Sequence, residues 1–160
     1  MNSKTVTETR IITSYTLEPK DANPAGNVHG GVIMKYIDTT AATVASRHAR
    51  SNAVTASIDR MDFHNPAFIG ELLTLSASIN LAGKTSMEIG VRAEAENLFT
   101  GEVRHIASAY LTFVSLDVAH KPKPIPGLIL ETDEERRRNQ QAIERTKLRL
   151  MEKEKEKAKS

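Results

Sequence analysis

The chain has 160 residues and no cysteine. That length suits one domain with its own hydrophobic core, and the composition excludes a disulfide scaffold, thiolate zinc sites and cysteine nucleophiles. The net charge is +2, and the last 30 residues carry 10 basic and 8 acidic side chains, so the rest of the chain is neutral. With only 4% aromatic residues, it lacks the basic face and stacking platforms of nucleic-acid binders.

The N-terminal residues give no sign of a targeting or membrane segment. The first ten, MNSKTVTETR, are polar and contain no apolar stretch of the signal-peptide type. No run in the chain approaches the roughly 20 apolar residues that span a bilayer. We therefore expect a cytoplasmic protein with neither a membrane nor a nucleic acid as partner.

The chain begins with a predicted strand and a loop. Residues 9–17 are rich in β-branched side chains, as short strands are. Residues 18–31 contain two Pro, three Gly and two Asn, which predicts an irregular loop.

A long helix is predicted from Gly30 to Ala49. Apolar side chains recur there at helical spacing, and small or apolar residues occupy the adjacent face as well, so we expect a helix buried nearly all round. The first of these stripes consists of Ile33, Ile37, Ala41 and Val44. Glycines replace a Ser or Thr cap at its start, which leaves the first backbone N–H groups accessible to another group.

Four further strands are predicted, at 53–63, 71–82, 85–97 and 103–117. The third alternates apolar and charged residues, which indicates a strand with one wet face. The short connections predict an antiparallel meander. The fold class is therefore α+β, with a long buried helix lying across a curved antiparallel sheet.

The C-terminal part of the chain changes character twice. Three prolines within 121–130 exclude a regular element there. Residues 131–160 are mostly charged and predict a helix, with Thr132 and Glu135 spaced as a capping box. We therefore divide the chain into a domain of residues 1–120, a proline-rich linker of 121–130 and a charged helical tail of 131–160. The tail is interpreted as a solvated helix that frays, or as a helix that binds a partner or braces an oligomer.

Asp38 is the most informative residue for function. It lies in the middle of the apolar helix, on the face of Met34 and Ala45. An ionised carboxylate is costly to bury alone, so we expect Asp38 to have a partner or a chemical role. An ion pair with Lys35, one turn earlier, is the other interpretation.

A second candidate feature is the segment that leads into the helix, with Asn23, Gly26, His29, Gly30 and Gly31 at regular spacing. Glycines at a helix start allow a ligand oxygen to reach free N–H groups, and the helix dipole stabilises negative charge there. A plain glycine-rich turn is the other interpretation, and His29 could be structural. The last glycine and the helical aspartate are seven residues apart, about 10 Å along the helix. That distance is long for one compact site within one chain, and a site shared by two subunits would remove the difficulty.

Other catalytic signatures are absent from the sequence. It contains no GxSxG elbow, no Walker loop, no dinucleotide fingerprint and no HExxH pair. We therefore expect no metal and no bound cofactor.

The segment Asn23-Pro24-x-Gly26-Asn27-Val28-His29-Gly30-Gly31, followed by Met34 and Ile37-Asp38, resembles the hotdog-fold acyl-coenzyme A thioesterases. Within them it is most similar to the acyl-CoA hydrolases related to the brain-type long-chain enzyme and its single-domain bacterial counterparts. The stretches Phe63-His64-Asn65-Pro66, Gly70-Glu71 and Gly83-Lys84-Thr85-Ser86-Met87-Glu88 extend the resemblance, which covers about residues 8–118.

The resemblance implies both a fold and a mechanism. An antiparallel sheet would wrap the helix, and two subunits would pair their sheets, so that Asn23 of one faces Asp38 of the other; a trimer of such dimers would follow. The Gly31 N–H would polarise the thioester carbonyl, Asn23 would position water or carbonyl, and Asp38 would act as base or nucleophile. Coenzyme A would be part of the substrate and product.

Coenzyme A carries three phosphates, which predicts basic and hydroxyl residues at its site. The candidates are Gly30, Arg60, His64, Lys84, Thr85 and Ser86, each of which could equally be an ordinary surface residue. A hotdog dehydratase or hydratase, a non-catalytic acyl-CoA-binding module and a coiled-coil adaptor remain as rival functions. Against the dehydratase or hydratase, the helix contains no Glu. Against the binding module, mere binding needs neither Asp38 nor Asn23. Against the coiled-coil adaptor, the tail has no sustained apolar heptad.

Overall fold

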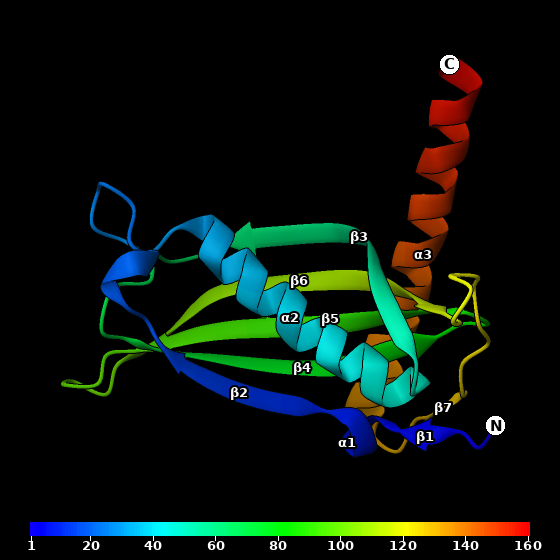
Figure 1. Ribbon diagram of the computed structural model, residues 1–160, viewed down its shortest axis with the longest axis horizontal. Coiled ribbons are helices and arrows are strands. Elements are labelled where there is room, and N and C mark those ends of the chain that lie inside the picture. The colour runs from blue at the N-terminus through cyan, green and yellow to red at the C-terminus, as the bar shows by residue number, and fades with distance from the viewer.

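The computed structural model describes residues 1–160, and its centre is one antiparallel sheet with a long helix across one face (Figure 1). The helix is α2 (Gly30–Ala49). The sheet has the strand order β2 (Ile11–Thr16), β4 (Leu72–Ala82), β5 (Ser86–Glu96), β6 (Val103–Leu116) and β3 (Asn52–Phe63). The predicted α+β class and the predicted helix and strands are therefore confirmed.

The order of the strands corrects one prediction. Only β4, β5 and β6 form a meander, because β3 pairs with β6 at the far edge and not with β4. The chain leaves β2 at one edge, crosses the sheet as α2 and returns as β3 at the other edge. Sequence adjacency suggested a meander of all four, but α2 carries the chain to the far edge before β3 begins, and the connection 64–71 then returns it to β4 beside β2. The edge strand β3 consequently has a paired strand on one side only.

Helix α2 also differs from its prediction. The predicted stripe is fully buried against the sheet, whereas the opposite side is open in the single chain, with Met34 41% exposed and Lys35 exposed. Small side chains at Ala41 and Ala45, both 0% exposed, allow close packing on the sheet. The helix is therefore buried on one face, not nearly all round.

Short elements near the N-terminus form a second, two-stranded sheet and two turns. Strand β1 (Lys4–Thr5) pairs in parallel with β7 (Leu128–Ile129), so the proline-rich segment does contain a two-residue strand, contrary to its prediction. The turn α1 (Val6–Thr9) and the 3₁₀ turn η1 (Pro19–Asp21) were not predicted. The Lys4 ammonium donates to the carbonyls of Arg47 and His48 and thereby satisfies the C-terminal end of α2.

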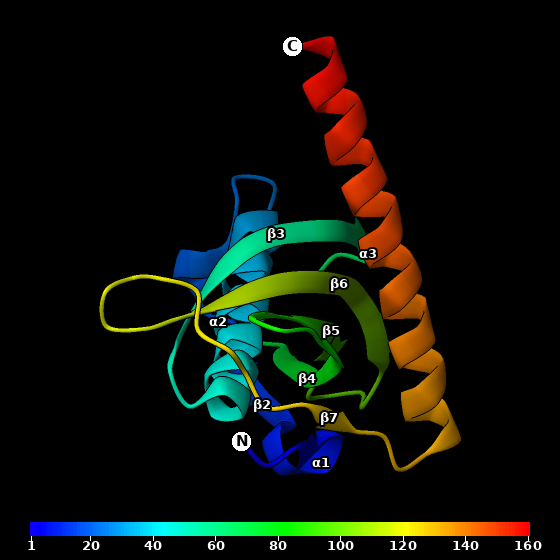
Figure 2. The same cartoon turned by 90° about the vertical axis from the view of Figure 1, so that its right-hand side faces the viewer.

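The charged tail forms helix α3 (Asp133–Lys159), and its predicted capping box is present. The first half packs on the sheet face opposite α2, where Ala142 is fully buried, and the last turns extend away from the body (Figure 2). The interpretation as a wholly solvated helix is therefore wrong for this first half. No helix combines the length and apolarity that a bilayer crossing needs.

Candidate active site

The N-terminus of α2 is an uncapped helix end. Its N-cap residue, His29, makes no side-chain cap hydrogen bond, and the first turn leaves the N–H groups of Gly30 and Gly31 without an intrahelical acceptor. A side chain at Gly31 would meet nothing within 4 Å, so the space in front of it is open. The helix dipole and two free N–H groups make this end a site for an oxygen that carries negative charge.

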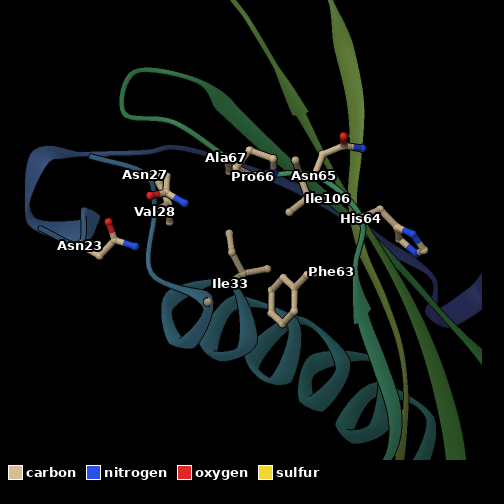
Figure 3. Close-up of a pocket in the computed structure, with 11 residues that line it drawn as sticks. Asn23, Asn27, Val28, Ile33, Phe63, His64, Asn65, Pro66, Ala67 and Ile106 are labelled. Atoms are coloured by element: carbon tan, nitrogen blue, oxygen red, sulfur yellow. The ribbon is translucent and has the colours of Figure 1, made fainter. Parts of the chain in front are cut away.

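A cavity of about 340 Å³ lies beside this helix end. Figure 3 shows Ile33 and Phe63 side by side near the start of α2, with Pro66 and Ala67 opposite them and Asn23 to one side. Val28, Ala67 and Ile106 add apolar walls. The cavity thus combines apolar side chains with amide and imidazole side chains, as sites for small organic ligands do.

The loop that carries Asn23 is held by backbone bonds. The Asn23 N–H donates to Asn27, and the Val28 N–H donates to Ala67 of the loop between β3 and β4. The Asn23 side-chain oxygen accepts the Ala25 N–H, which leaves its amide NH₂ without a partner in the chain. Asn23 is therefore fixed in place with two donors free.

Asp38 lies on the part of α2 that faces the edge strand. Its Oδ1 accepts a 2.6 Å hydrogen bond from the Thr55 hydroxyl of β3. Asp38 is half-buried in the single chain. The predicted partner is therefore present, as Thr55, whereas the alternative ion pair with Lys35 does not form. Sequence reasoning missed Thr55, because only the turn of β3 back along α2 brings residues 17 apart into contact.

Asp38 does not line the cavity at the helix end. It lies seven residues, about 10 Å, beyond Gly31 along the helix. Within one chain the aspartate and the helix terminus are therefore separate, as the sequence spacing indicated.

A buried ion pair fixes the second loop of the cavity. The Arg104 guanidinium donates to both Glu71 oxygens and to the Pro66 carbonyl, while Glu71 also accepts the Phe68 N–H. The side chains are 19% and 7% exposed. The guanidinium beside Glu71 lowers the pKa of that carboxyl, and Glu71 raises the pKa of Arg104. The pair ties loop residues 65–70 to β6.

The predicted coenzyme A residues do not meet in one chain. His64 borders the cavity, but its imidazole points away from Phe63 (Figure 3) and stacks on His105 with ring centroids 4.5 Å apart. Arg60 pairs with Asp62 at the surface. Lys84, Thr85 and Ser86 form the β4–β5 turn at the opposite end of the sheet, about 26 Å away by strand rise. No cluster of His, Asp or Glu suited to a metal is present.

Comparison with known proteins identifies the family. The thioesterase superfamily model matches residues 25–98. The chain is 37% identical over 138 residues to the uncharacterized acyl-CoA thioester hydrolase YkhA of Bacillus subtilis, covering 86% of this chain and 80% of that protein. This chain belongs to the acyl-CoA thioester hydrolases. It spans about a third of the length of the mammalian cytosolic acyl coenzyme A thioester hydrolases that it also matches.

Solved acyl-CoA thioester hydrolases have the same hotdog fold. An apo-hexameric acyl-CoA thioesterase superposes with a TM-score of 0.91 at 39% identity, covering 95% of this chain and 97% of its own. The acyl-CoA hydrolase of Staphylococcus aureus, in complex with butyryl coenzyme A, coenzyme A and coenzyme A disulfide, superposes with a TM-score of 0.89 at 34% identity, covering 98% and 96%.

The Staphylococcus aureus enzyme has also been solved with an asparagine, an aspartate or a threonine replaced by alanine. In its chain these three residues are separated by 15 and 17 positions. Asn23, Asp38 and Thr55 have the same residue types and the same separations.

Proposed function

We propose that this protein hydrolyses fatty acyl-CoA thioesters to the free acid and coenzyme A, at a site shared by two copies of the chain. The observation that carries the proposal is the uncapped N-terminus of α2 beside a cavity with both apolar and polar walls, in a member of the acyl-CoA thioester hydrolases. The free N–H groups would bind the thioester oxygen, and the cavity would take the acyl chain.

The shared site follows from the distance between Asp38 and the helix terminus. The open edge β3 lies beside Asp38 and exposes apolar side chains, with Phe63 50% exposed. A long apolar edge strand favours pairing with another strand. Two copies joined at β3 by a two-fold axis would bring the partner's Asn23 and Gly31 towards Asp38. A trimer of such dimers is the assembly we expect, and a hexameric relative supports it.

The reaction assigns each group a step. The Gly31 N–H donates to the thioester oxygen and stabilises the negative charge that develops on it. Asp38, oriented by Thr55, takes a proton from water, whose oxygen attacks the carbonyl carbon. Asn23 donates an amide N–H to the water or the carbonyl. The C–S bond then breaks, and the coenzyme A thiolate leaves and regains a proton. Attack by Asp38 itself, through an anhydride that water opens, gives the same products.

The residues predicted to bind coenzyme A are part of the same proposal. Gly30 and His64 would lie at the near end of the site. Because Lys84, Thr85 and Ser86 lie at the other end of the sheet, they would reach the phosphates of a substrate only from the second copy. Arg60, on the edge strand, would lie near the junction of the two sheets. A cytoplasmic location is proposed as well, and cell fractionation tests it.

The test is hydrolysis of acyl-CoAs from acetyl to palmitoyl, followed by the released thiol with a thiol-reactive dye. The absence of cysteine makes the protein silent in this assay. We expect turnover that peaks at one chain length and falls by a factor of about 10² or more in Asp38→Asn, with circular dichroism unchanged. Near-normal turnover in Asp38→Asn would remove the base assignment. Binding of acyl-CoA without turnover by the wild-type protein would favour a binding module.

A further inference from the structure

Helix α3 is anchored across the outer face of the sheet, the face opposite α2. Asn139 donates to the Asn80 carbonyl on β4. Arg145 pairs with Glu88 on β5, which is 2% exposed, and lies 3.6 Å from the ring centroid of Tyr110 on β6. Further along, Arg149 pairs with Asp59 on β3 and donates to Thr112 on β6. The contacts follow the order of the strands, so α3 crosses the sheet from β4 towards β3.

The helix does not stop at the edge of its own sheet. Residues 150–160 are all exposed, and both views show these turns extending past β3 (Figures 1 and 2). Ten helical residues rise about 15 Å, the width of about three strands. A segment of this length and charge is marginal as an isolated helix in water.

The strand under the point of exit is the unpaired edge. β3 has β6 on one side and no strand on the other. Val54, Ile58 and Phe63 along it are 41%, 38% and 50% exposed. If the sheet continues here into the sheet of a second copy, the protruding turns of α3 lie over the outer face of that copy.

We infer that residues 150–159 of α3 dock on the outer face of a second copy of this chain and clamp the two sheets together. This inference rests on the β3-paired dimer of the proposed function. The sheet-facing stripe of α3 continues beyond Arg149 as Glu152, Lys153 and Glu156, which carry both charges. The surface under it also carries both charges.

The strand register shows which residues of β3 belong to the outer face, where the protruding turns would dock. Arg60 and Asp62 stand opposite Tyr110 and Ser108 of β6, and directly opposite residues of an antiparallel pair point to the same face. Tyr110 faces α3, so both charged residues belong to the outer face. In the β3-paired dimer, the partner's Arg60 and the partner's Asp62 would lie at the edge that the protruding turns reach, beside the partner subunit's own α3, which crosses the same face from β4 to β3.

The two lysines at 153 and 155 provide a matched test. Around the helix axis, Lys153 is about 20° from the buried Ala142 and Lys155 about 140° from it. Lys153→Glu and Lys155→Glu make the same charge change on the sheet-facing side and the far side. We measure hydrogen exchange of residues 150–159 in the assembled full-length protein, and the subunit dissociation constant by analytical ultracentrifugation.

We expect the amides of residues 150–159 to exchange about tenfold more slowly in the assembly than after dilution to single chains. Lys153→Glu should remove that protection and raise the dissociation constant about fivefold, whereas Lys155→Glu should match the wild type. An assembled, active enzyme whose residues 150–159 exchange freely, or equal effects of both variants, would overturn the inference alone. Activity of the single chain would contradict both this inference and the shared site of the proposed function. An assembled wild-type protein without turnover would contradict the proposed reaction only.

Discussion

At the scale of single residues, the contact between Thr55 and Asp38 determines what the carboxylate can do. One carboxylate oxygen is occupied by the Thr55 hydroxyl at 2.6 Å. The other oxygen makes no hydrogen bond within the chain and can accept a proton from water. The hydroxyl thus orients the carboxylate without consuming its capacity as a base. In the proposed reaction, Thr55 serves as a positioning residue for Asp38.

Replacement of Thr55 by valine tests this role. The side chain keeps its shape but loses the hydroxyl, and a hydrogen bond to a charged group contributes about 1.5–3 kcal/mol. We expect kcat to fall about 10- to 100-fold with KM nearly unchanged, and Thr55→Ser to restore most of the rate. Steady-state kinetics on the best acyl-CoA gives the result. A matching loss in the serine variant would indicate a packing effect instead.

At the scale of elements, helix α2 is fixed at its C-terminal end by a buried histidine. His48 is 0% exposed, and its Nε2–H donates to the Pro126 carbonyl at 2.8 Å, which ties the helix to the proline-rich segment. Burial is the main cause that lowers the pKa of His48, with Lys4 acting in the same direction, while the Pro126 carbonyl and Glu8 oppose it. The folded protein therefore holds this imidazole neutral.

The pH dependence of stability follows from that lowered pKa. As pH falls below the ordinary value of 6.5, the unfolded chain binds a proton at His48 more readily than the folded chain does, because the pKa is lowered in the folded state. The free energy of unfolding should therefore decrease as pH falls below about 6.5 and stay level above it. Denaturant titrations at pH 7.5 and pH 5.0 measure the change, and His48→Gln should reduce it. His105, whose pKa is also lowered by burial, accounts for a remaining slope. An equal slope in both proteins would contradict the assignment to His48.

At the scale of the whole molecule, the open edge β3 and the separation of Asp38 from Gly31 point to the same requirement for a second copy. The edge exposes apolar side chains, and the carboxylate beside it lies about 10 Å from the helix end of its own chain. A two-fold dimer would satisfy both, since each site would take Asp38 from one copy and Asn23 from the other.

Mixing two inactive variants tests the dimer directly. Unfold and refold equal amounts of Asn23→Ala and Asp38→Asn together. Half of the dimers formed at random are mixed, and each mixed dimer has one site with both residues intact, so about a quarter of wild-type activity should return. Each variant refolded alone provides the control. No recovery in a properly assembled mixture would mean that each site is built from one chain.

The helices and strands were largely predictable because their signals are local. The stripe from Ile33 to Val44 predicts α2, and Thr132 with Glu135 predicts the start of α3. The placement of β3 was not predictable, since its pairing with β6 depends on how far α2 carries the chain across the sheet. The packing of α3 depends on Arg145 and Glu88, which are 57 residues apart and look like ordinary surface charges in the sequence.

The same division applies to the site. The sequence by itself provided the candidate groups: the glycine-led helix start indicates Gly31, the carboxylate among apolar residues indicates Asp38, and the family resemblance indicates Asn23. Only the tertiary structure decided that Thr55 holds Asp38, that Glu71 and Arg104 fix the cavity loop, and that Lys84 lies far from His64. These relations are set by strand register and helix crossing, which are properties of the packed chain and not of any local pattern.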